Sequence, residues 1–241
     1  MSTETHQIVV SGVTVQVIRK AIKNLHLGVY PPNGRVRVAA PLRVSDNAVR
    51  LAIVDKLGWI KRQRAKFDGQ PRQSVRELVS GESHYVFGRR YRLRVIHGPG
   101  RAMVKTRGRW MDMHVPQGTS AVKRSRVLQV WYRECLRARA LPLVIKWQRA
   151  IGVDVTDWGI KRMKTKWGTC NPNAGRIWLN LELAKKPMRC VEYLVVHELV
   201  HLIERTHNQR FLALMDEHLP DWRSRRTLLN TQPLAHDTWE Y

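Results

Sequence analysis

The first part of the chain alternates apolar and polar residues in short runs, a pattern typical of β-strands with one buried face. Residues 7–18 alternate around Ser11-Gly12, and residues 25–30 and 35–40 alternate on either side of Pro31-Pro32-Asn33-Gly34. Glycine, proline and asparagine at these breaks favour tight turns. The pattern therefore predicts two hairpins that open the chain as a β-meander.

The same alternation recurs farther along the chain. It predicts strands over residues 85–95, 102–106 and 109–115, and two more near residues 159–164 and 176–181. On the first of these strands every second residue is a cation that should face outward. This predicts an arginine ladder formed by Arg90, Arg92 and Arg94.

Helical spacing of apolar residues predicts two further elements. A helix over residues 45–60 has Ser45 or Asp46 placed as its cap. A long helix capped by Thr119 or Ser120 runs over about residues 121–150 and is expected to end at Gly152. We expect an interruption near Pro142, because proline removes a hydrogen-bond donor inside a helix.

The break Pro116-Gln117-Gly118 predicts the boundary between two regions. The expected fold is α+β: a β-rich basic region over residues 1–116 and a zincin-like catalytic region over residues 117–241. In the second region a small sheet should lie over a buried helix at residues 191–203. An edge strand of such a sheet can align an extended peptide.

That buried helix carries the motif H-E-x-x-H. His197 and His201 are four residues apart, so a helix projects both imidazoles from one face toward a single metal ion. Glu198 lies beside them, where a carboxylate can accept a proton from a metal-activated water. His207 can return as a third ligand and leave the fourth position open, which is typical of a catalytic zinc site.

A structural interpretation competes with the catalytic one: the histidines of a buried amphipathic helix can simply pack or form hydrogen bonds. It is the weaker interpretation, because burying two imidazoles and a carboxylate costs free energy unless a metal ion binds them. Cys170 lies in a predicted loop between the last two strands and has no partner at ligand spacing, so a cysteine-ligated zinc is not expected.

Four segments in a fixed order resemble the YgjP-like metal-dependent hydrolases, which are relatives of the SprT-like and WLM proteases. The segments lie at residues 163–170 (M-K-T-K-W-G-T-C), 176–180, 193–202 and 207–211. The resemblance implies that His197, His201 and His207 ligate Zn²⁺ and that Glu198 is the catalytic acid/base. Metzincin proteases share the histidine spacing but place a turn glycine where this chain has Glu204, which argues against that family.

The chain of 241 residues is strongly basic, with 43 Lys and Arg against 19 Asp and Glu and a formal net charge of +24. Such an excess predicts attraction to polyanions such as nucleic acid or a nucleotide, although a merely solvated basic surface is the plain alternative. No apolar run reaches the roughly 20 residues that span a bilayer, so no membrane contact is expected. The three cysteines lack C-x-x-C spacing, which favours a reduced, cytoplasmic protein.

Two enzymatic functions and one binding function remain open. A zinc metallopeptidase cleaving peptides or proteins is favoured, with another divalent ion as a possible substitute for zinc. The alternatives are a nucleoside triphosphate pyrophosphatase or phosphohydrolase whose arginines hold phosphates, and a nucleic-acid-associated protein with a vestigial metal site. Candidate substrate contacts are Trp167, Asn180 and the arginine ladder, and the donor that faces the metal is open among Trp167, Asn180, Lys166 and Tyr193.

Overall fold

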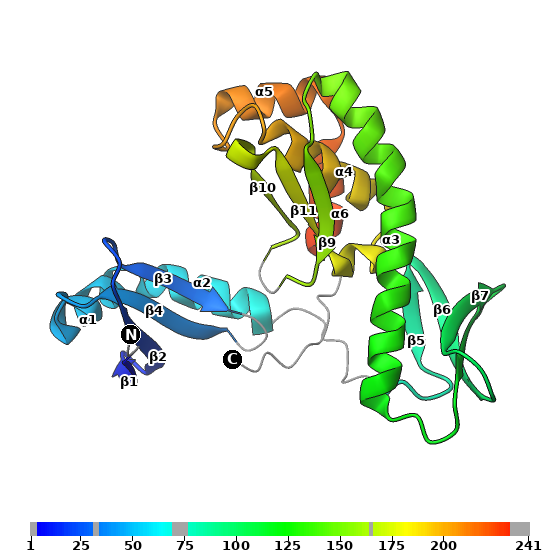
Figure 1. Ribbon diagram of the computed structural model, residues 1–241. Helices are drawn as coiled ribbons and strands as arrows, with labels where there is room; N and C mark the ends of the chain where they lie inside the picture. The colour runs from blue at the N-terminus through cyan, green and yellow to red at the C-terminus, as the bar shows by residue number, and fades with distance from the viewer. Residues whose placement is uncertain (1–3, 31–33, 69–76, 164–165, 232–241) are drawn as a thin grey trace. The chain divides into compact units, whose positions relative to one another are not determined.

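The computed structural model describes residues 4–30, 34–68, 77–163 and 166–231 (Figure 1). It is a mixed α+β structure with three small sheets and, in the described part of the chain, six α-helices. Contacts divide the chain into two units, residues 1–73 with 233–241 and residues 74–232. Each unit has a hydrophobic core of its own.

The first unit is a four-stranded sheet with two helices. Its elements are β1 (Thr5–Val10), β2 (Val13–Lys20), β3 (His26–Tyr30), β4 (Arg35–Pro41), α1 (Asp46–Asp55) and α2 (Leu57–Asp68). Both predicted hairpins form, but the strand order is β1-β2-β4-β3, with β2 parallel to β4. The predicted meander is therefore wrong. Strand β4 is more apolar than β3 and lies in the interior of the sheet, between β2 and β3. Its Val36, Val38 and Ala40 are almost fully buried.

The predicted helix over residues 45–60 is two helices. Ser45 caps α1 through its side chain, as expected, and α1 ends at Lys56. The apolar residues of both helices still pack on one face of the sheet, where Val49, Ile53 and Ile60 are fully buried. The apolar face continues through both helices, so the spacing of apolar residues did not reveal the break between α1 and α2 at Lys56.

The second unit begins with another four-stranded sheet, of order β5-β6-β8-β7. Its strands are β5 (Ser83–Val86), β6 (Arg89–His97), β7 (Met103–Arg107) and β8 (Trp110–Val115). The single strand predicted over residues 85–95 is a hairpin that turns at Phe87-Gly88, where φ is 46° and 82°. Two successive residues with positive φ match the two-residue turn that joins twisted antiparallel strands.

The long helix α3 (Ala121–Ile151) is uninterrupted and contains Pro142, so the predicted interruption is wrong. Ser120 caps its start and Gly152 ends it in the left-handed conformation (φ 73°), as the sequence suggested. Buried residues recur along the whole length of α3. They share one core with the β5-β6-β8-β7 sheet and with the helices that follow α3. The predicted boundary at Pro116-Gln117-Gly118 thus lies inside the second unit, as the turn between β8 and α3.

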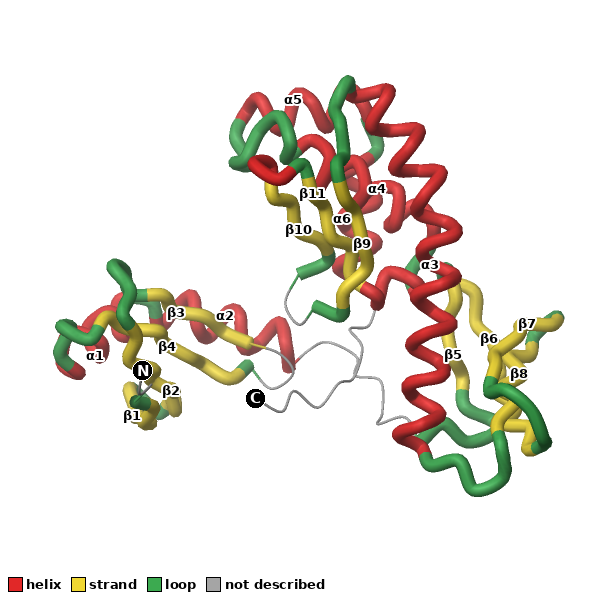
Figure 2. Tube along the Cα trace, viewed as in Figure 1, coloured by secondary structure: helices red, strands yellow, loops and turns green. Residues whose placement is uncertain are grey.

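The rest of the second unit is a three-stranded sheet followed by helices (Figure 2). The elements are β9 (Asp157–Lys161), β10 (Gly168–Asn171), η1 (Pro172–Ala174), β11 (Arg176–Asn180), η2 (Leu181–Lys185), α4 (Met188–Val200), α5 (Gln209–His218) and α6 (Trp222–Thr231). The sheet order is β10-β11-β9. The segment with Cys170, predicted as a loop, is therefore an edge strand. None of the helices in the described ranges is long and apolar enough to cross a bilayer.

Candidate metal centre

Helix α4 is buried around most of its circumference and ends at the candidate site. Val191, Val195 and Leu199 are completely buried, and Glu198 is only 4% exposed. The helix stops at Val200 with His201 as its C-cap, a little earlier than the sequence predicted. His197 and His201 still lie one turn apart, because the helical spacing continues through that last turn.

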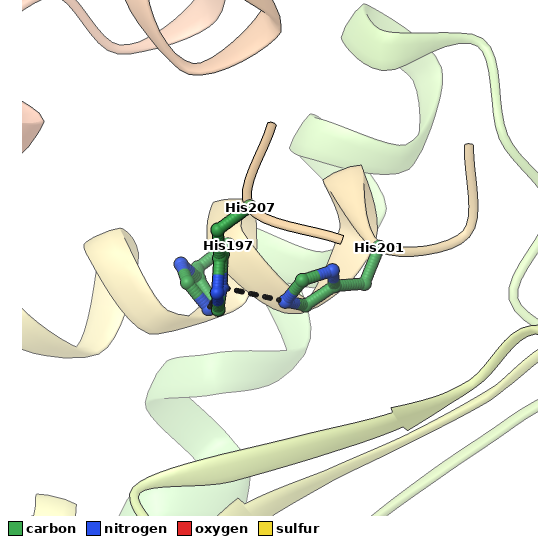
Figure 3. A group of neighbouring side chains, drawn as sticks. All are labelled: His197, His201 and His207. Carbon is green, nitrogen blue, oxygen red and sulfur yellow. Dashed lines mark hydrogen bonds between the residues drawn. The ribbon is translucent and has the colours of Figure 1, made fainter. Parts of the chain in front are cut away.

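The three predicted ligands converge (Figure 3). The Nε2 atom of His207 lies 3.1 Å from Nε2 of His201 and 3.2 Å from Nε2 of His197. Three nitrogens bound at about 2.0–2.1 Å to one tetrahedral ion lie about 3.3 Å apart. The observed spacing is therefore close to the spacing that one bound metal ion requires.

Hydrogen bonding between the imidazoles cannot account for this cluster. The Nδ1 atom of His201 lies 2.9 Å from the carbonyl oxygen of Glu204, which fixes the proton on Nδ1 and leaves the neutral ring's Nε2 with a lone pair. A proton on Nε2 of His207 can then point to only one of its two neighbours. A shared divalent cation satisfies all three nitrogens, so the residues fit a metal ion.

The loop that returns His207 to the site is held by Glu204. Its carboxylate accepts hydrogen bonds from the backbone nitrogen of Thr206 at 3.1 Å and from the hydroxyl of Thr206 at 2.9 Å. Asn208 then caps α5 by accepting from the backbone nitrogen of Phe211. Glu204 therefore orients His201 through its carbonyl group and the loop of His207 through its side chain.

The ring of Phe211 packs against all three imidazoles. Its ring is 1% exposed, and its centroid lies 5.0 Å from the ring of His197 and 4.7 Å from each of the other two imidazoles. Phe211, Leu212, Leu214 and Met215 form an apolar stripe in the sequence, which predicts packing against the metal helix, and this packing is confirmed. The contact of one ring with all three ligands was not foreseen, because it depends on how α5 folds back onto α4.

Burial sets the protonation of the site. It lowers the pKa of His197 to about 3, with further lowering by His201, His207 and Arg226. Burial also raises the pKa of Glu198 to about 8, against a smaller opposing effect of Lys166. Burial also lowers the pKa of His201, so without a cation the site favours neutral His197 and His201 and a protonated Glu198.

Gly168 makes room for Glu198, and the sequence alone did not single it out. A Cβ atom at this position of β10 would lie 2.3 Å from Oε1 of Glu198. Only glycine lets the edge strand come this close to the carboxylate. The signal in the sequence was weak: one glycine inside the segment M-K-T-K-W-G-T-C.

The predicted substrate contacts Asn180, the last residue of β11, and Trp167 both have structural partners. Asn180 is 4% exposed, and its side-chain nitrogen donates to the carbonyl oxygens of Met163 and Lys166 at 2.8 and 2.7 Å. Its side-chain oxygen accepts from the backbone nitrogen of Glu182 at 3.2 Å. Asn180 is thus bonded to the backbone of Met163 and Lys166 and is not free to contact a substrate through its side-chain nitrogen. Trp167 is partly buried and packs against the main core.

The arginine ladder lies away from these residues, on β6. Its alternation is confirmed, because Leu93 is buried while Arg90 and Arg92 are exposed. Arg94 binds Asp112 through two hydrogen bonds of 2.7 and 2.9 Å and lies over the ring of Trp110. No hydrogen bond, ion pair or ring contact among the described residues joins Arg90, Arg92 or Arg94 to the three histidines.

An α+β protein with three converging histidines on and beyond an H-E-x-x-H helix has the site of a metal-dependent hydrolase. The family model for the YgjP-like, metallopeptidase domain matches residues 23–232. The chain therefore belongs to the YgjP-like metallopeptidase family, which implies a divalent metal and a peptide or protein substrate.

Two further comparisons complete the picture. The crystal structure of the metallopeptidase zymogen of Pyrococcus abyssi abylysin is similar at 18% sequence identity and a TM-score of 0.35, covering 40% of this chain and 99% of that one. A search of curated proteins finds no match.

Proposed function

We propose that the protein is a zinc-dependent peptidase in which Glu198 is the general base. The observation that supports this most directly is the convergence of three imidazoles beside a buried carboxyl group. His197, His201 and His207 would hold the ion through their Nε2 atoms. When bound there, zinc supplies Lewis-acid polarisation of the scissile carbonyl and lowers the pKa of water toward about 7.

The protein's own residues provide the proton transfers. Glu198 takes a proton from the attacking water on its carboxylate as the new C–O bond forms, and then delivers that proton to the nitrogen of the leaving amine as the peptide C–N bond breaks. Burial raises the pKa of Glu198 to about 8 in the metal-free protein, and a cation bound beside it would lower that pKa and favour the carboxylate that accepts the proton. Phe211 and the core around it exclude bulk water from one side of the site.

The edge strand β10 is the proposed binding surface for the peptide. It pairs with β11 on one side only, in the order β10-β11-β9, and its first residue, Gly168, lies against Glu198. An extended peptide that adds to this edge by main-chain hydrogen bonds would place its carbonyl beside Glu198. Together with α4 this forms the zincin-like arrangement that we propose.

Lys166 is the best-supported of the four candidate donors for the developing oxyanion. It is exposed and close enough for its charge to lower the pKa of Glu198. Asn180 is occupied by the loop, and Tyr193 is 5% exposed and stacked on Trp222. Trp167 remains a candidate for contact with a substrate side chain.

The test is a hydrolysis screen of zinc-loaded protein on a peptide library and on nucleoside triphosphates in parallel. We expect peptide cleavage that Glu198→Gln lowers by about 10²- to 10⁴-fold while one ion per chain is retained. Cleavage of nucleoside triphosphates alone would refute the peptidase and favour the phosphohydrolase. No hydrolysis of either class, with metal bound, would favour a nucleic-acid-associated protein with a vestigial site.

Two weaker proposals concern the setting of the enzyme. Polyanion contact through Arg90, Arg92 and Arg94 loses support, because Arg94 is paired with Asp112. A cytoplasmic location is inferred from three unpaired cysteines, Cys135, Cys170 and Cys190.

A further inference from the structure

Three exposed cations lie near the candidate metal centre, and each comes from a different segment of the second unit. Lys166 precedes β10, Arg205 lies on the loop that carries His207, and Arg226 lies on α6. Among the residues that the structure describes, no carboxylate forms an ion pair with any of the three. Their charges are therefore available to a substrate at the centre.

Lys166 lies beside the carboxyl group of the site. It comes two residues before Gly168, where a Cβ atom would lie 2.3 Å from Oε1 of Glu198. Burial raises the pKa of Glu198 to about 8, and the charge of Lys166 opposes this rise. Lys166 therefore places positive charge where the edge strand meets the centre.

Arg205 reaches toward the same strand from the loop that carries His207. Burial and Glu198 raise the pKa of the Cys170 thiol to about 11, and the charge of Arg205 partly offsets that rise. Cys170 and Gly168 are two residues apart on β10, so they share one face of the strand. Arg205 therefore adds positive charge about two residues along the edge strand from Glu198.

Arg226 lies on a face of α6 that packs toward the metal ligands. Trp222, one turn earlier on α6, stacks on Tyr193 with ring centroids 6.4 Å apart, and the ring of Tyr193 lies 5.7 Å from that of His197. Residues four apart share one helix face, and long side chains on a helix point back toward its N-terminus. The Arg226 side chain is therefore directed toward these rings. Burial lowers the pKa of His197 to about 3, and Arg226 is one of the charges that lower it further.

The carboxylates on the same elements do not offset these cations. Four are bonded within the fold: Glu192 and Asp221 to Arg225, Asp216 to Arg223, and Glu204 to Thr206. Glu217 is exposed, and helical spacing places it on the side of α5 opposite the buried Met215. The described surroundings of the centre therefore carry an excess of positive charge, which favours a substrate with anionic side chains.

We propose that the enzyme selects peptides with an acidic side chain within about two residues of the scissile bond, and that Arg205 and Arg226 bind this carboxylate. This inference rests on the proposed peptidase function and names its substrate class. An extended peptide paired with β10 rises by about 3.3 Å per residue, so a side chain two residues from the scissile carbonyl lies opposite Cys170, where Arg205 reaches. Arginine suits this role because its guanidinium group stays charged and presents several N–H donors to one carboxylate.

The test starts from a peptide that the zinc-loaded protein cleaves and replaces single residues near the scissile bond by glutamate, glutamine or lysine. We expect kcat/KM for the best glutamate peptide to exceed that of its glutamine counterpart by about 5- to 50-fold at low salt. The ratio should shrink as salt is raised. Fluorescence anisotropy of both labelled peptides with zinc-loaded Glu198→Gln measures the same preference without turnover.

Variants identify the residues that set the preference. Arg205→Gln and Arg226→Gln should each lower the glutamate-to-glutamine ratio, and the double variant should bring it close to one. Arg226→Glu should favour the lysine peptide, a result that a loss of folding cannot produce. The matched control is Arg126→Gln, which removes an exposed charge from α3 that acts on neither His197 nor Glu198, and the ratio should stay unchanged.

Equal kcat/KM for the glutamate and glutamine peptides would overturn this inference and leave the peptidase in place. A ratio preserved in the double variant, or lowered equally by Arg126→Gln, would also overturn it. If no peptide is cleaved, the proposed peptidase fails and this inference fails with it. One zinc ion per chain in each variant shows that a lost preference is not a loss of metal.

Discussion

Two carboxylates on helix α4, Glu192 and Glu198, lie in opposite environments. The position of Glu192 in the sequence predicts a residue on the helix surface. In the structure it accepts hydrogen bonds from Lys146, Trp147 and Arg225 at 3.2, 3.0 and 2.7 Å, so that prediction is wrong. Burial alone would raise the pKa of Glu192, but these hydrogen bonds outweigh burial and lower it. Burial raises the pKa of Glu198 to about 8, with only a weak opposing effect of Lys166.

The difference separates a structural carboxylate from a functional one. Glu192 joins α3, α4 and α6, and its charge is compensated inside the fold. Glu198 is buried without such hydrogen bonds, which lowers the stability of the fold when its carboxyl group ionises. It lies next to the three imidazoles that can hold a metal ion. A glutamate on α4 can therefore be either structural or functional. The groups that bond to its carboxylate decide which of the two it is.

The largest expected effect is a gain of stability in metal-free Glu198→Gln. A carboxyl group with a raised folded-state pKa is progressively penalised as pH rises from about 4.5 to about 8, since the unfolded chain ionises first. Glutamine avoids the penalty, so the variant should gain on the order of 5 kcal/mol above pH 8 and little at pH 4.5. Urea unfolding at both pH values measures this, and a pH-independent difference would contradict it.

Glu192→Gln should act in the opposite direction. Losing charged hydrogen bonds to Arg225 and Lys146 should destabilise the fold by about 2 to 3 kcal/mol at pH 7. The pKa of Glu192 is lowered, so its contribution is present above about pH 4.5 and is lost as pH falls through the folded-state pKa. The exposed Glu217→Gln on α5 is the matched control, and equal unfolding free energies of the two variants would refute the structural role.

A smaller effect, on zinc affinity, is expected at Glu204, which contacts both His201 and the loop that carries His207. Removing its carboxylate in Glu204→Ala should weaken zinc binding by about 10- to 100-fold, because the loop that carries His207 loses its two bonds to Thr206. Glu204→Gln keeps an acceptor oxygen and should bind zinc nearly as the wild type does. Competition with a chelating dye measures both, and identical affinities of the Ala and Gln variants would exclude the proposed positioning.

Long-range pairing explains where sequence reasoning failed. Residues 168–171 include glycine and asparagine and show no apolar alternation, so they did not indicate a strand; β10 exists because β11 pairs with it. The outward arginines of β6 were read correctly from alternation. Only the parallel neighbour β8 supplies Asp112 to Arg94, and no local pattern reveals that partner.

The sequence by itself determined what depends on neighbours a few residues apart. It determined the caps at Ser45 and Ser120, the helix end at Gly152, and one face of α4 carrying His197 and His201. Tertiary structure decided what depends on burial and distant partners: the return of His207, the protonation of Glu198 and the edge strand against it. Helical geometry repeats within a turn, whereas desolvation and convergence arise only when remote segments pack together.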